Sequence, residues 1–516
     1  KRRRGSREGK KITFALYFIS GYDETINNIS AASNTNHDGT RLYCRLARSV
    51  PEVDFMELPQ TPMELNTYLN QHFTCPCGKE HFASLRAVRI GKDALYELPN
   101  LVKLMGFESL YLVSDAITYE IAGKACRKIL EDAGIRNHLI QLTHTGFDEA
   151  TLGELTIQMP MDCDLVIAVG TGAINDMVRF FSYRMGRPFY TVATAAPMDG
   201  FASSIAAIQS NHLKTTFDAQ TPTAIIGDTE ILKNAPYSMI AAGLGDLLGK
   251  FTCLCDWKLA RLINGEHYCE RIVELVENCV TKVLGDAEKV KARDPETMGK
   301  IMEGLVLAGV AMSLYGNSRP ASGCEHHMSH YWEMIFEQTG KRPVPHGTQV
   351  GVGTVLILKL VEALRKTPVD FDAARASARA YDPFSWENKI REAYGPAAQG
   401  VIDMESAAGK NETAGRLARI DRIEAHWEEI LTLLEGLPSS DQIAHILCSL
   451  DSPCLPDQIG VDRTLLKKTY LYCKEVRARY TILQMIWDLG LLDTLSDHVI
   501  DTLPFADSSK EPLCHP

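Results

Sequence analysis

Short apolar runs alternate with amphipathic segments through the first half of the chain. Three runs have the length and the continuous apolar character of buried strands, at 110–114, 164–170 and 188–194. Helical patterns that end at a glycine follow the first two runs, at 121–133 and 174–185. Strands separated by helices predict a parallel sheet with helices on both faces. Ligands of such sheets bind at the carboxyl ends of the strands, so functional residues are expected there.

Beyond about residue 236 the strand pattern fades and long helical patterns dominate. These patterns cover 260–284, 298–314, 354–365, 415–434 and 464–491. The change predicts an α/β, Rossmann-like nucleotide-binding domain followed by an all-α domain. We place the first domain at 66–236 and the second at 237–500.

The two ends of the chain differ from these domains. The first residues, Lys1 to Arg4, are basic, and a polar stretch follows further on. We interpret residues 1–65 as an extension without a packed core. A targeting arm or a signal peptide is the less favoured interpretation, because no small-residue cleavage pattern follows the apolar run at 12–19. Residues 501–516 are interpreted as a tail.

The composition of the 516 residues is that of a globular protein, with 45% apolar and 23% charged residues, which excludes a disordered or collagen-like chain. The 54 basic and 65 acidic residues leave a net charge of −11, which argues against a nucleic-acid partner. The 14 cysteines are scattered, as is typical of reduced thiols in the cytoplasm. Strongly apolar stretches are expected to fall far short of the ~20 residues that span a bilayer, so we expect no integral membrane contact.

A glycine-containing turn, Val169 to Asp176, joins the second predicted strand to the helix after it. Gly170 and Gly172 would let the backbone approach a ligand closely, and the N-terminus of the helix suits a diphosphate. The turn lacks the third glycine of G-x-G-x-x-G, so tight packing alone is an alternative interpretation. After the next strand comes Asp199, which either faces a cofactor and substrate or caps a helix.

Histidines cluster in the helical half of the chain. His326 and His330 are four residues apart, so they share one face of a helix, and His327 lies beside the first. His346 in a Pro-His-Gly turn and Asp246 between apolar residues are further candidate ligands. One aspartate and two histidines are sufficient for a catalytic metal site with an open position. For each residue alone, a buried structural histidine or a capping aspartate is the alternative.

A second candidate cluster lies near the start of the α/β domain. Cys75 and Cys77 are followed by His81, and two thiols with an imidazole at this spacing can bind zinc. No second cysteine pair stands at a suitable spacing, so a surface loop with incidental thiols is the alternative interpretation.

These segments, taken in order, resemble the sn-glycerol-1-phosphate dehydrogenases of the iron-containing alcohol dehydrogenase and dehydroquinate synthase-like superfamily. The most specific part is the run from Ser318 to His326, and the resemblance extends over roughly residues 70 to 495. It implies a two-domain enzyme that interconverts dihydroxyacetone phosphate and sn-glycerol 1-phosphate with NADH or NADPH, and so feeds glycerophospholipid synthesis. It also implies a small-molecule substrate, a cytoplasmic location and a homo-oligomer, a dimer or larger.

The resemblance also implies roles for individual residues. The cofactor would contact Asp115 through its ribose, Gly170, Gly172, Ala173, Ile174, Asn175 and Asp176 through its diphosphate, and Thr194, Ala195, Ala196, Pro197 and Ser203 near its nicotinamide. The substrate would contact Asp199, Asp246 and His330, of which Asp199 and His330 are the catalytic residues. A phosphate-bearing substrate also needs a cation or a helix N-terminus, and Arg319, before a predicted helix start, is our candidate, with a surface salt bridge as the alternative. The metal, zinc or else nickel or iron, would be held by Asp246, His326 and His346.

Two departures from the family pattern stand out: Arg179 replaces an expected lysine, and His327 competes with His326 as a ligand. Three alternatives remain: a dehydrogenase of another polyol such as glycerol, a dehydroquinate synthase-like cyclase, and a non-catalytic nucleotide-binding protein. The last is disfavoured because Asp246, His326 and His346 are all present. The choice between NAD and NADP stays open.

Overall fold

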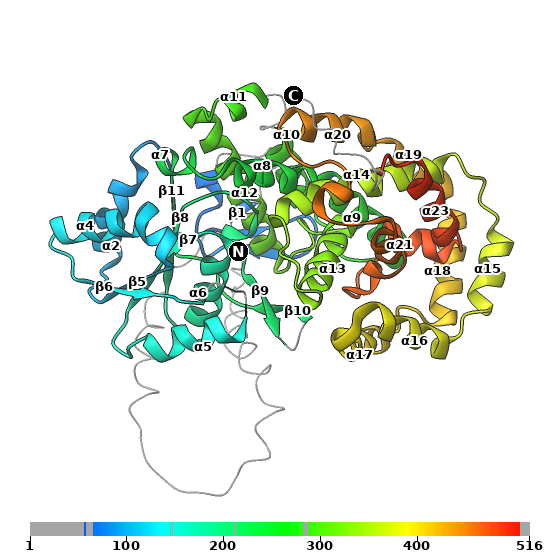
Figure 1. The fold of residues 1–516 in the computed structure, drawn as a ribbon, viewed down its shortest axis with the longest axis horizontal. Helices are drawn as coiled ribbons and strands as arrows, with labels where there is room; N and C mark the ends of the chain where they lie inside the picture. Colours follow the sequence, from blue (N-terminus) through cyan, green and yellow to red (C-terminus); the bar gives the residue numbers. More distant parts are fainter. Residues whose placement is uncertain are drawn as a thin grey trace, which may run out of the picture. The chain divides into compact units, whose positions relative to one another are not determined.

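The computed structural model describes residues 56–57, 65–144, 146, 148–210, 213–281 and 287–505. Most of the predicted extension at 1–65 and most of the tail at 501–516 lie outside these residues. Within the described part, the first half of the chain forms the predicted parallel sheet and the second half is helical, which confirms the predicted fold class (Figure 1). The domain boundaries stay predictions.

The main sheet has six parallel strands. Their order across the sheet is β4 (Ala87–Gly91), β11 (Ala224–Asp228), β8 (Phe189–Ala193), β7 (Leu165–Gly170), β5 (Leu110–Ser114) and β6 (Asn137–Gln141). The chain passes from β5 to β6 on one side and then to β7 on the other. The strand order therefore reverses at β5 and β7, which is where ligands bind in open α/β sheets.

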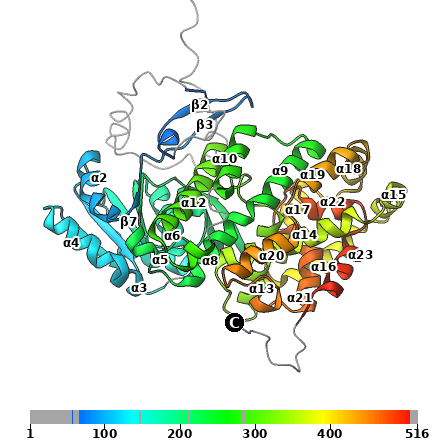
Figure 2. The ribbon, with the colours of Figure 1, turned by 90° about the horizontal axis from the view of Figure 1, so that it is seen from above.

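Side chains alternate between the two faces of the sheet, and each face has its own helices. Along β5, Leu110 and Leu112 belong to a core with helices α2 (Leu98–Met105) and α4 (Lys124–Asp132). Tyr111 and Val113 belong to the opposite core, with α5 (Glu149–Gln158) and α6 (Gly172–Arg184). Figures 1 and 2 show these two pairs of helices on opposite sides of the sheet. Because both faces are covered, the strands read as continuous apolar runs.

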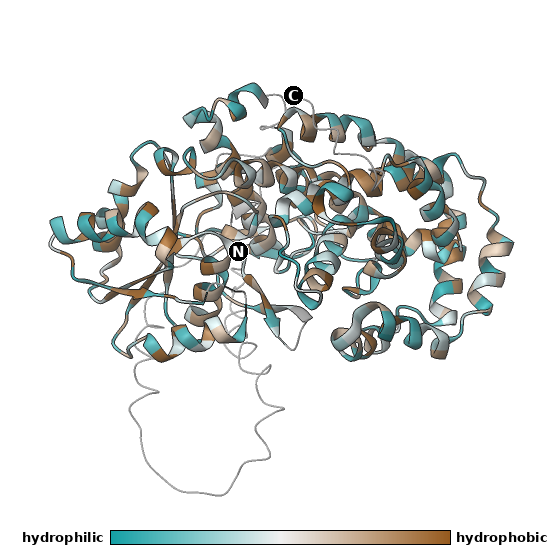
Figure 3. Ribbon diagram, in the orientation of Figure 1, coloured by the Kyte–Doolittle hydropathy of each residue, from teal (hydrophilic) through white to brown (hydrophobic). Residues whose placement is uncertain are grey.

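The helical half packs around three long helical segments. These are α8 (Tyr237–Leu248), which continues into α9 (Lys250–Asn264), α12 (Pro295–Tyr315), and α14 (His346–Arg365). The other helices of this half are α10 (Glu270–Thr281), α11 (Ala287–Lys291), α13 (Cys324–Gln338), α15 (Phe371–Arg379), α16 (Pro383–Tyr394), α17 (Ala398–Ala408), α18 (Thr413–Ala425), α19 (Trp427–Glu435), α20 (Ser440–Ser449), α21 (Arg463–Tyr472), α22 (Ile482–Asp488) and α23 (Leu492–Thr502). Figure 3 shows hydrophilic and hydrophobic residues alternating along outer helices such as α11, as expected where one face meets solvent.

The remaining elements are short. A small sheet is formed by β1 (Met56–Glu57), β2 (His72–Thr74) and β3 (Glu80–Phe82), and an antiparallel hairpin is formed by β9 (Ile205–Ser210) and β10 (Leu213–Asp218). Two short helices, α3 (Ala116–Thr118) and α7 (Thr229–Leu232), follow strands of the main sheet. The apolar runs used for prediction did not reveal β4, β6 and β11.

Several predicted helices are divided in the structure. The pattern at 260–284 is divided after α9, because Gly265 takes a left-handed conformation with φ of 66°; residues 282–284 lie outside the described part. The pattern at 415–434 is divided at His426, where α18 ends and α19 begins. The pattern at 464–491 is divided between α21 and α22. Apolar periodicity continued across each of these breaks.

Three helical segments correct the expectation about apolar stretches. By length and composition, 237–264, 295–315 and 346–365 are each apolar enough to cross a membrane. In the structure, 83%, 83% and 89% of their most apolar windows are buried inside the protein. Their apolar character therefore follows from their central position, where neighbouring helices surround them.

Candidate active site

The predicted cofactor residues lie along the carboxyl edge of the main sheet. Asp115 directly follows β5, Gly170 ends β7, and Thr194 directly follows β8. These strands are neighbours, with Val113 paired to Ala168 on β7. The topology therefore brings all three positions to the point where the strand order reverses.

The N-terminus of α6 faces this edge without a side-chain cap. Thr171 is its N-cap residue, and its side chain makes no capping hydrogen bond. The first backbone N–H groups of the helix can therefore donate to a bound ligand. Asn175 is directed inward instead, and its Oδ1 accepts a hydrogen bond from Thr191 Oγ1 at 2.6 Å. Asp115 caps α3, where its Oδ1 accepts from Thr118 N at 2.7 Å. These two residues thus have structural contacts beside any contact with a cofactor.

Arg179 fastens the loop after β8 to α6. Its guanidinium is buried and pairs with Asp176 Oδ1 at 2.6 Å. It also donates to the backbone oxygens of Gly200, Phe201 (2.9 Å) and Ile205 (3.0 Å). The departure from lysine therefore stabilises the loop that carries Asp199, because a guanidinium can donate to several acceptors at once.

The loop 194–203 is in close contact with the helical half, and glycines make this possible. A Cβ on Gly243 of α8 would lie 2.2 Å from the backbone oxygen of Ala196. A Cβ on Gly347 of α14 would lie 2.9 Å from the backbone oxygen of Pro197, and one on Gly309 of α12 would lie 2.8 Å from Ala202 N. Only residues without a Cβ let three helices approach one loop so closely.

The structure brings the three predicted metal ligands together from three helices. Asp246 lies on α8, His326 on α13 and His346 at the first position of α14. One ligand atom of each lies within 4.8 Å of the others, and Nε2 of His326 is 3.4 Å from Oδ1 of Asp246. Asp199 N donates to Asp246 Oδ2 at 3.0 Å, so this cluster adjoins the loop after β8.

Two glutamates that sequence analysis missed orient the histidines. Glu325 is completely buried, and its Oε1 lies 2.7 Å from Nδ1 of His326. Glu333 lies 3.0 Å from Nδ1 of His346 and 3.2 Å from Nδ1 of His330. Metal-binding histidines usually donate their second ring N–H to a carboxylate, so this donor set fits a divalent metal. Glu325 directly precedes His326 in the sequence, and Glu333 is three residues after His330, but neither position is a signal by itself.

Lys250 is a third residue that sequence analysis did not assign. Its buried ammonium lies 2.6 Å from Asp199 Oδ2 and 2.9 Å from Asp246 Oδ1. Burial alone would raise the pKa of Asp246, but Lys250, together with His326 and His346, holds it well below its usual value. Burial and the neighbouring charge of Asp246 raise the pKa of Asp199. The two carboxyls therefore differ in acidity.

Two other candidates lie in structural surroundings. His327 is buried, with no hydrogen bond to either ring nitrogen within the described residues, and burial lowers its pKa well below the usual value. It is therefore neutral and outside the Asp246 cluster. Arg319 is buried and pairs with Glu266 at 2.9 Å, and it donates to the backbone oxygens of Asp256 and Tyr480. These contacts give no support to a substrate role for Arg319.

Two other arginines converge on the loop before α13. Arg477 Nη1 and Arg479 Nη2 each donate to Ser318 Oγ at 3.0 Å, and Arg479 Nη1 lies 3.3 Å from the backbone oxygen of Ser322. Neither forms an ion pair with a carboxylate among the described residues. Burial lowers the pKa of Arg477 to about 10. Two neighbouring guanidiniums without a carboxylate form a favourable place for an anion.

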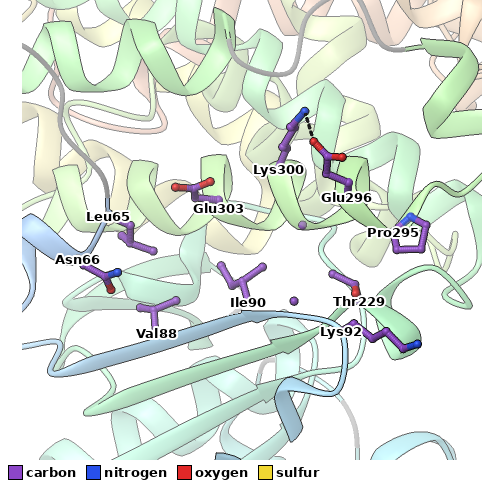
Figure 4. Close-up of a pocket in the computed structure, with 12 residues that line it drawn as sticks. Leu65, Asn66, Val88, Ile90, Lys92, Thr229, Pro295, Glu296, Lys300 and Glu303 are labelled. Carbon is purple, nitrogen blue, oxygen red and sulfur yellow. Dashed lines mark ion pairs between the residues drawn. The ribbon is translucent and has the colours of Figure 1, made fainter.

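A pocket of about 680 Å³ lies elsewhere, between the edge strand β4 and α12 (Figure 4). Its charged residues include Lys300 and Glu296, which pair with each other at 2.9 Å. None of the predicted site residues lines it.

Comparison with known proteins identifies the family of this chain. The sequence pattern of the family described as iron-containing alcohol dehydrogenase matches residues 89–236. Glycerol-1-phosphate dehydrogenase (NAD(P)+) of Halalkalibacterium halodurans is 31% identical over 79% of this chain and 94% of its own length. The protein of the same name from Bacillus subtilis is 30% identical, over 77% and 90%. That of Pyrococcus furiosus is 37% identical, over 53% and 78%.

Solved structures agree on the fold. The glycerol dehydrogenase of Schizosaccharomyces pombe has a TM-score of 0.54 at 14% identity and covers 87% of this chain and 94% of its own. The sulfoacetaldehyde reductase of Bifidobacterium kashiwanohense, solved in complex with NAD+, has a TM-score of 0.52 at 12% identity and covers 82% and 98%. With relatives at 30% identity or more over most of both chains, this chain belongs to the glycerol-1-phosphate dehydrogenase family of the iron-containing alcohol dehydrogenases.

Proposed function

We propose that this chain catalyses the reversible, NAD(P)H-linked reduction of dihydroxyacetone phosphate to sn-glycerol 1-phosphate, a precursor of glycerophospholipids. The observation that carries the proposal is the cluster of Asp246, His326 and His346 directly beside the loop after β8. A hydride donor on the sheet edge and a metal on the helices would meet at this contact. The relatives that share most of their length with this chain carry the same activity in their names.

The chain's own residues would hold two partners there. Asp246, His326 and His346 would bind the metal, with Glu325 and Glu333 fixing the orientation of the two imidazoles. When bound, the metal supplies Lewis-acid polarisation of the substrate's carbonyl oxygen and the nicotinamide supplies the hydride. The N-terminus of α6, from Gly172 to Asp176, would hold the cofactor diphosphate, with Asp115 at the ribose and Thr194 to Pro197 and Ser203 near the nicotinamide. Aspartate and histidine side chains such as Asp246 and His326 can bind zinc, nickel or iron.

Reduction of a ketone also requires a proton. His330 would exchange it at Nε2, because Nδ1 is held by Glu333 at 3.2 Å. Its ring lies 5.3 Å from that of His346 and 6.1 Å from that of His326, centroid to centroid. Asp199 would contact a substrate hydroxyl, because its carboxylate adjoins the cluster through Lys250.

The substrate's phosphate requires a cationic partner. Arg477 and Arg479 supply two guanidiniums beside Ser318, on the loop that leads into the helix of His326 and His330. We assign the phosphate to this pair rather than to Arg319, whose guanidinium is bonded to Glu266. Replacing Arg479 with glutamine should raise KM for dihydroxyacetone phosphate roughly 10- to 100-fold, since a hydrogen bond to a charged group contributes about 1.5–3 kcal/mol. An unchanged KM for NAD(P)H is the internal control.

The reaction is tested by following NAD(P)H absorbance with metal-reconstituted protein and dihydroxyacetone phosphate. Loss of absorbance that a chelator abolishes and zinc or nickel restores supports the reaction, and comparison of NADH with NADPH ranks the cofactors. Asp246→Asn should abolish turnover and metal binding at the cluster of Asp246, His326 and His346. Asp370→Asn is the matched control, because Asp370 only caps α15 and asparagine caps equally well. The product must be the 1-phosphate in a stereospecific assay.

The other outcomes would each reject the proposal in favour of a stated alternative. Activity on glycerol without activity on glycerol 1-phosphate would indicate a different polyol dehydrogenase. Nucleotide binding with no net change in NADH for any substrate would indicate a cyclase.

We also propose a homo-oligomer in the cytoplasm without integral membrane contact. The cytoplasmic location is supported by the twelve cysteines of the described residues, which form no disulfide.

A further inference from the structure

We propose that Cys75, Cys77, His81 and Cys269 form a structural zinc site, separate from the Asp246 cluster. Three of these residues come from the β2–β3 hairpin, and Cys269 comes from the segment directly before α10, 188 residues after His81. One ligand atom of each lies within 4.8 Å of the others. The proposed dehydrogenase reaction uses none of these four residues.

The distances match the edges of a metal-centred tetrahedron. Zinc binds cysteine sulfur at ~2.3 Å and histidine nitrogen at ~2.0 Å, which places two sulfurs about 3.8 Å apart and a sulfur and a nitrogen about 3.5 Å apart. Here Cys75 Sγ lies 3.6 Å from Cys269 Sγ. Nε2 of His81 lies 3.2 Å from Cys77 Sγ and 3.5 Å from Cys269 Sγ. The side chains therefore need only small shifts to accept a zinc ion.

The orientation of His81 also fits a metal ligand. Its Nδ1 lies 2.8 Å from the backbone oxygen of Leu314, near the end of α12, and a carbonyl can only accept. Nδ1 therefore carries the proton, and Nε2 presents its lone pair to the three sulfurs. A ring N–H donated to a backbone oxygen is typical of zinc-bound histidine.

The local chain holds the two hairpin thiols toward the same point. Gly78 N donates to the backbone oxygen of Cys75 at 3.0 Å, which closes a tight turn around Pro76 and Cys77. Gly78 has φ of 87°, a conformation that glycine adopts without strain. Nε2 of His267 lies 3.2 Å from the backbone oxygen of Cys77, so the segment before α10 also contacts this turn.

Four protein ligands leave no open position for a substrate, which is the mark of a structural rather than a catalytic zinc site. His81 and Cys269 are buried, whereas Cys75 and Cys77 are partly exposed. Zinc binding would displace the three thiol protons to solvent and leave a complex with one net negative charge.

The site would fasten a weak element to the body of the protein. Strands β1, β2 and β3 have only two or three residues each, too few for a stable sheet by themselves. A zinc ion would connect this sheet to α10 directly and to α12 through His81 and Leu314. We expect the loss of zinc to release this hairpin first.

The experiment measures zinc per chain in full-length Asp246→Asn protein, in which the other metal cluster is disabled. We expect about one zinc per chain after dialysis against a mild chelator. Adding Cys269→Ser should reduce the zinc content at least tenfold, and adding Cys279→Ser should leave it unchanged. Cys279 is the matched control, because it is a buried cysteine of α10 that donates to Leu275 O and lies outside the cluster. X-ray absorption should show a sulfur shell at ~2.3 Å.

Three results would overturn the proposal. These are a zinc content that Cys269→Ser does not change, a zinc shell of nitrogen and oxygen only, and a disulfide between Cys75 and Cys269 in the isolated protein. If Cys269→Ser does not fold, Cys77→Ser, at a partly exposed position, replaces it. Cobalt in the Asp246→Asn protein provides a check without a cysteine variant. A thiolate-to-cobalt charge-transfer band supports the site, and its absence rejects it.

Discussion

Replacing Glu325 with glutamine tests whether this buried carboxylate sets the metal affinity of His326. Oε1 of Glu325 accepts from Gly323 N at 2.7 Å and lies 2.7 Å from His326 Nδ1, while Oε2 accepts from Thr252 Oγ1 at 2.6 Å. Burial alone would raise the pKa of Glu325, but the bond to His326 leads the contacts that lower it, so the group is charged.

The structure predicts that glutamine keeps this geometry and loses only the charge. Its Oε1 can still accept from Gly323 and His326. Its Nε2 can donate to Thr252 Oγ1, whose own proton has a second acceptor, the backbone oxygen of Gly249 at 3.1 Å. Loss of a carboxylate behind a ligating histidine typically costs 10- to 100-fold in metal affinity, about 1.4–2.7 kcal/mol. We expect Glu325→Gln near the lower value.

Alanine provides the comparison. Glu325→Ala leaves two buried donors, Gly323 N and His326 Nδ1, without an acceptor. Each costs about 1–3 kcal/mol, so this variant should lower stability as well as metal affinity. Competition with a chromophoric chelator measures the affinity, and thermal unfolding of the metal-free protein measures the stability. If Glu325→Gln binds zinc as tightly as the unchanged protein while Glu325→Ala only lowers the melting temperature, Glu325 is purely structural and the reasoning is refuted.

Gly243→Ala would place a Cβ 2.2 Å from Ala196 O and should destabilise the folded protein by roughly 1–3 kcal/mol. Gly153→Ala, in the open interior of α5, should instead stabilise it by roughly 0.5–1 kcal/mol. Equal midpoints of chemical denaturation for the two variants would contradict this prediction. Lys250→Met leaves two buried carboxylates without their cation, so melting of the metal-free protein should fall by more than that of the zinc-loaded protein. Burial raises the pKa of Glu405 from about 4.5 in the unfolded chain to about 7 in the folded protein. The folded protein therefore holds this proton more tightly, which adds stability in full below pH 4.5. This contribution is lost as the pH rises through 7. Glu405→Gln should therefore flatten the fall in stability between pH 5 and 8, and an unchanged slope would reject this account.

Much of the fold follows from local pattern. The strands at 110–114, 165–170 and 189–193 are buried on both faces, so their sequences are continuous apolar runs that are visible without any tertiary information. The glycine turn after β7 and the helix that follows it are equally local. The edge strand β4 and the strand β11 were not predicted from the sequence, because five-residue segments that include a glycine resemble the start of a loop.

The residues of the candidate site also fall into those that the sequence reveals and those that it does not. Asp246, His326 and His346 were recognisable because they stand in unusual short contexts, and His326 and His330 are related by one helical turn. Glu325, Glu333 and Lys250 were not, since a charged residue on a helix is most often a solvated one. Their roles depend on burial and on partners from other helices, which no local pattern encodes.

The four cysteine and histidine residues near the small sheet show this division most clearly. The sequence by itself determined the turn that presents Cys75 and Cys77 and the spacing to His81, because a tight turn and a short hairpin are local structures. Only the tertiary structure decided that Cys269 completes the cluster. That contact joins residues more than 180 positions apart, and it exists because α10 and α12 pack against each other in the core, an arrangement that many distant apolar contacts decide together.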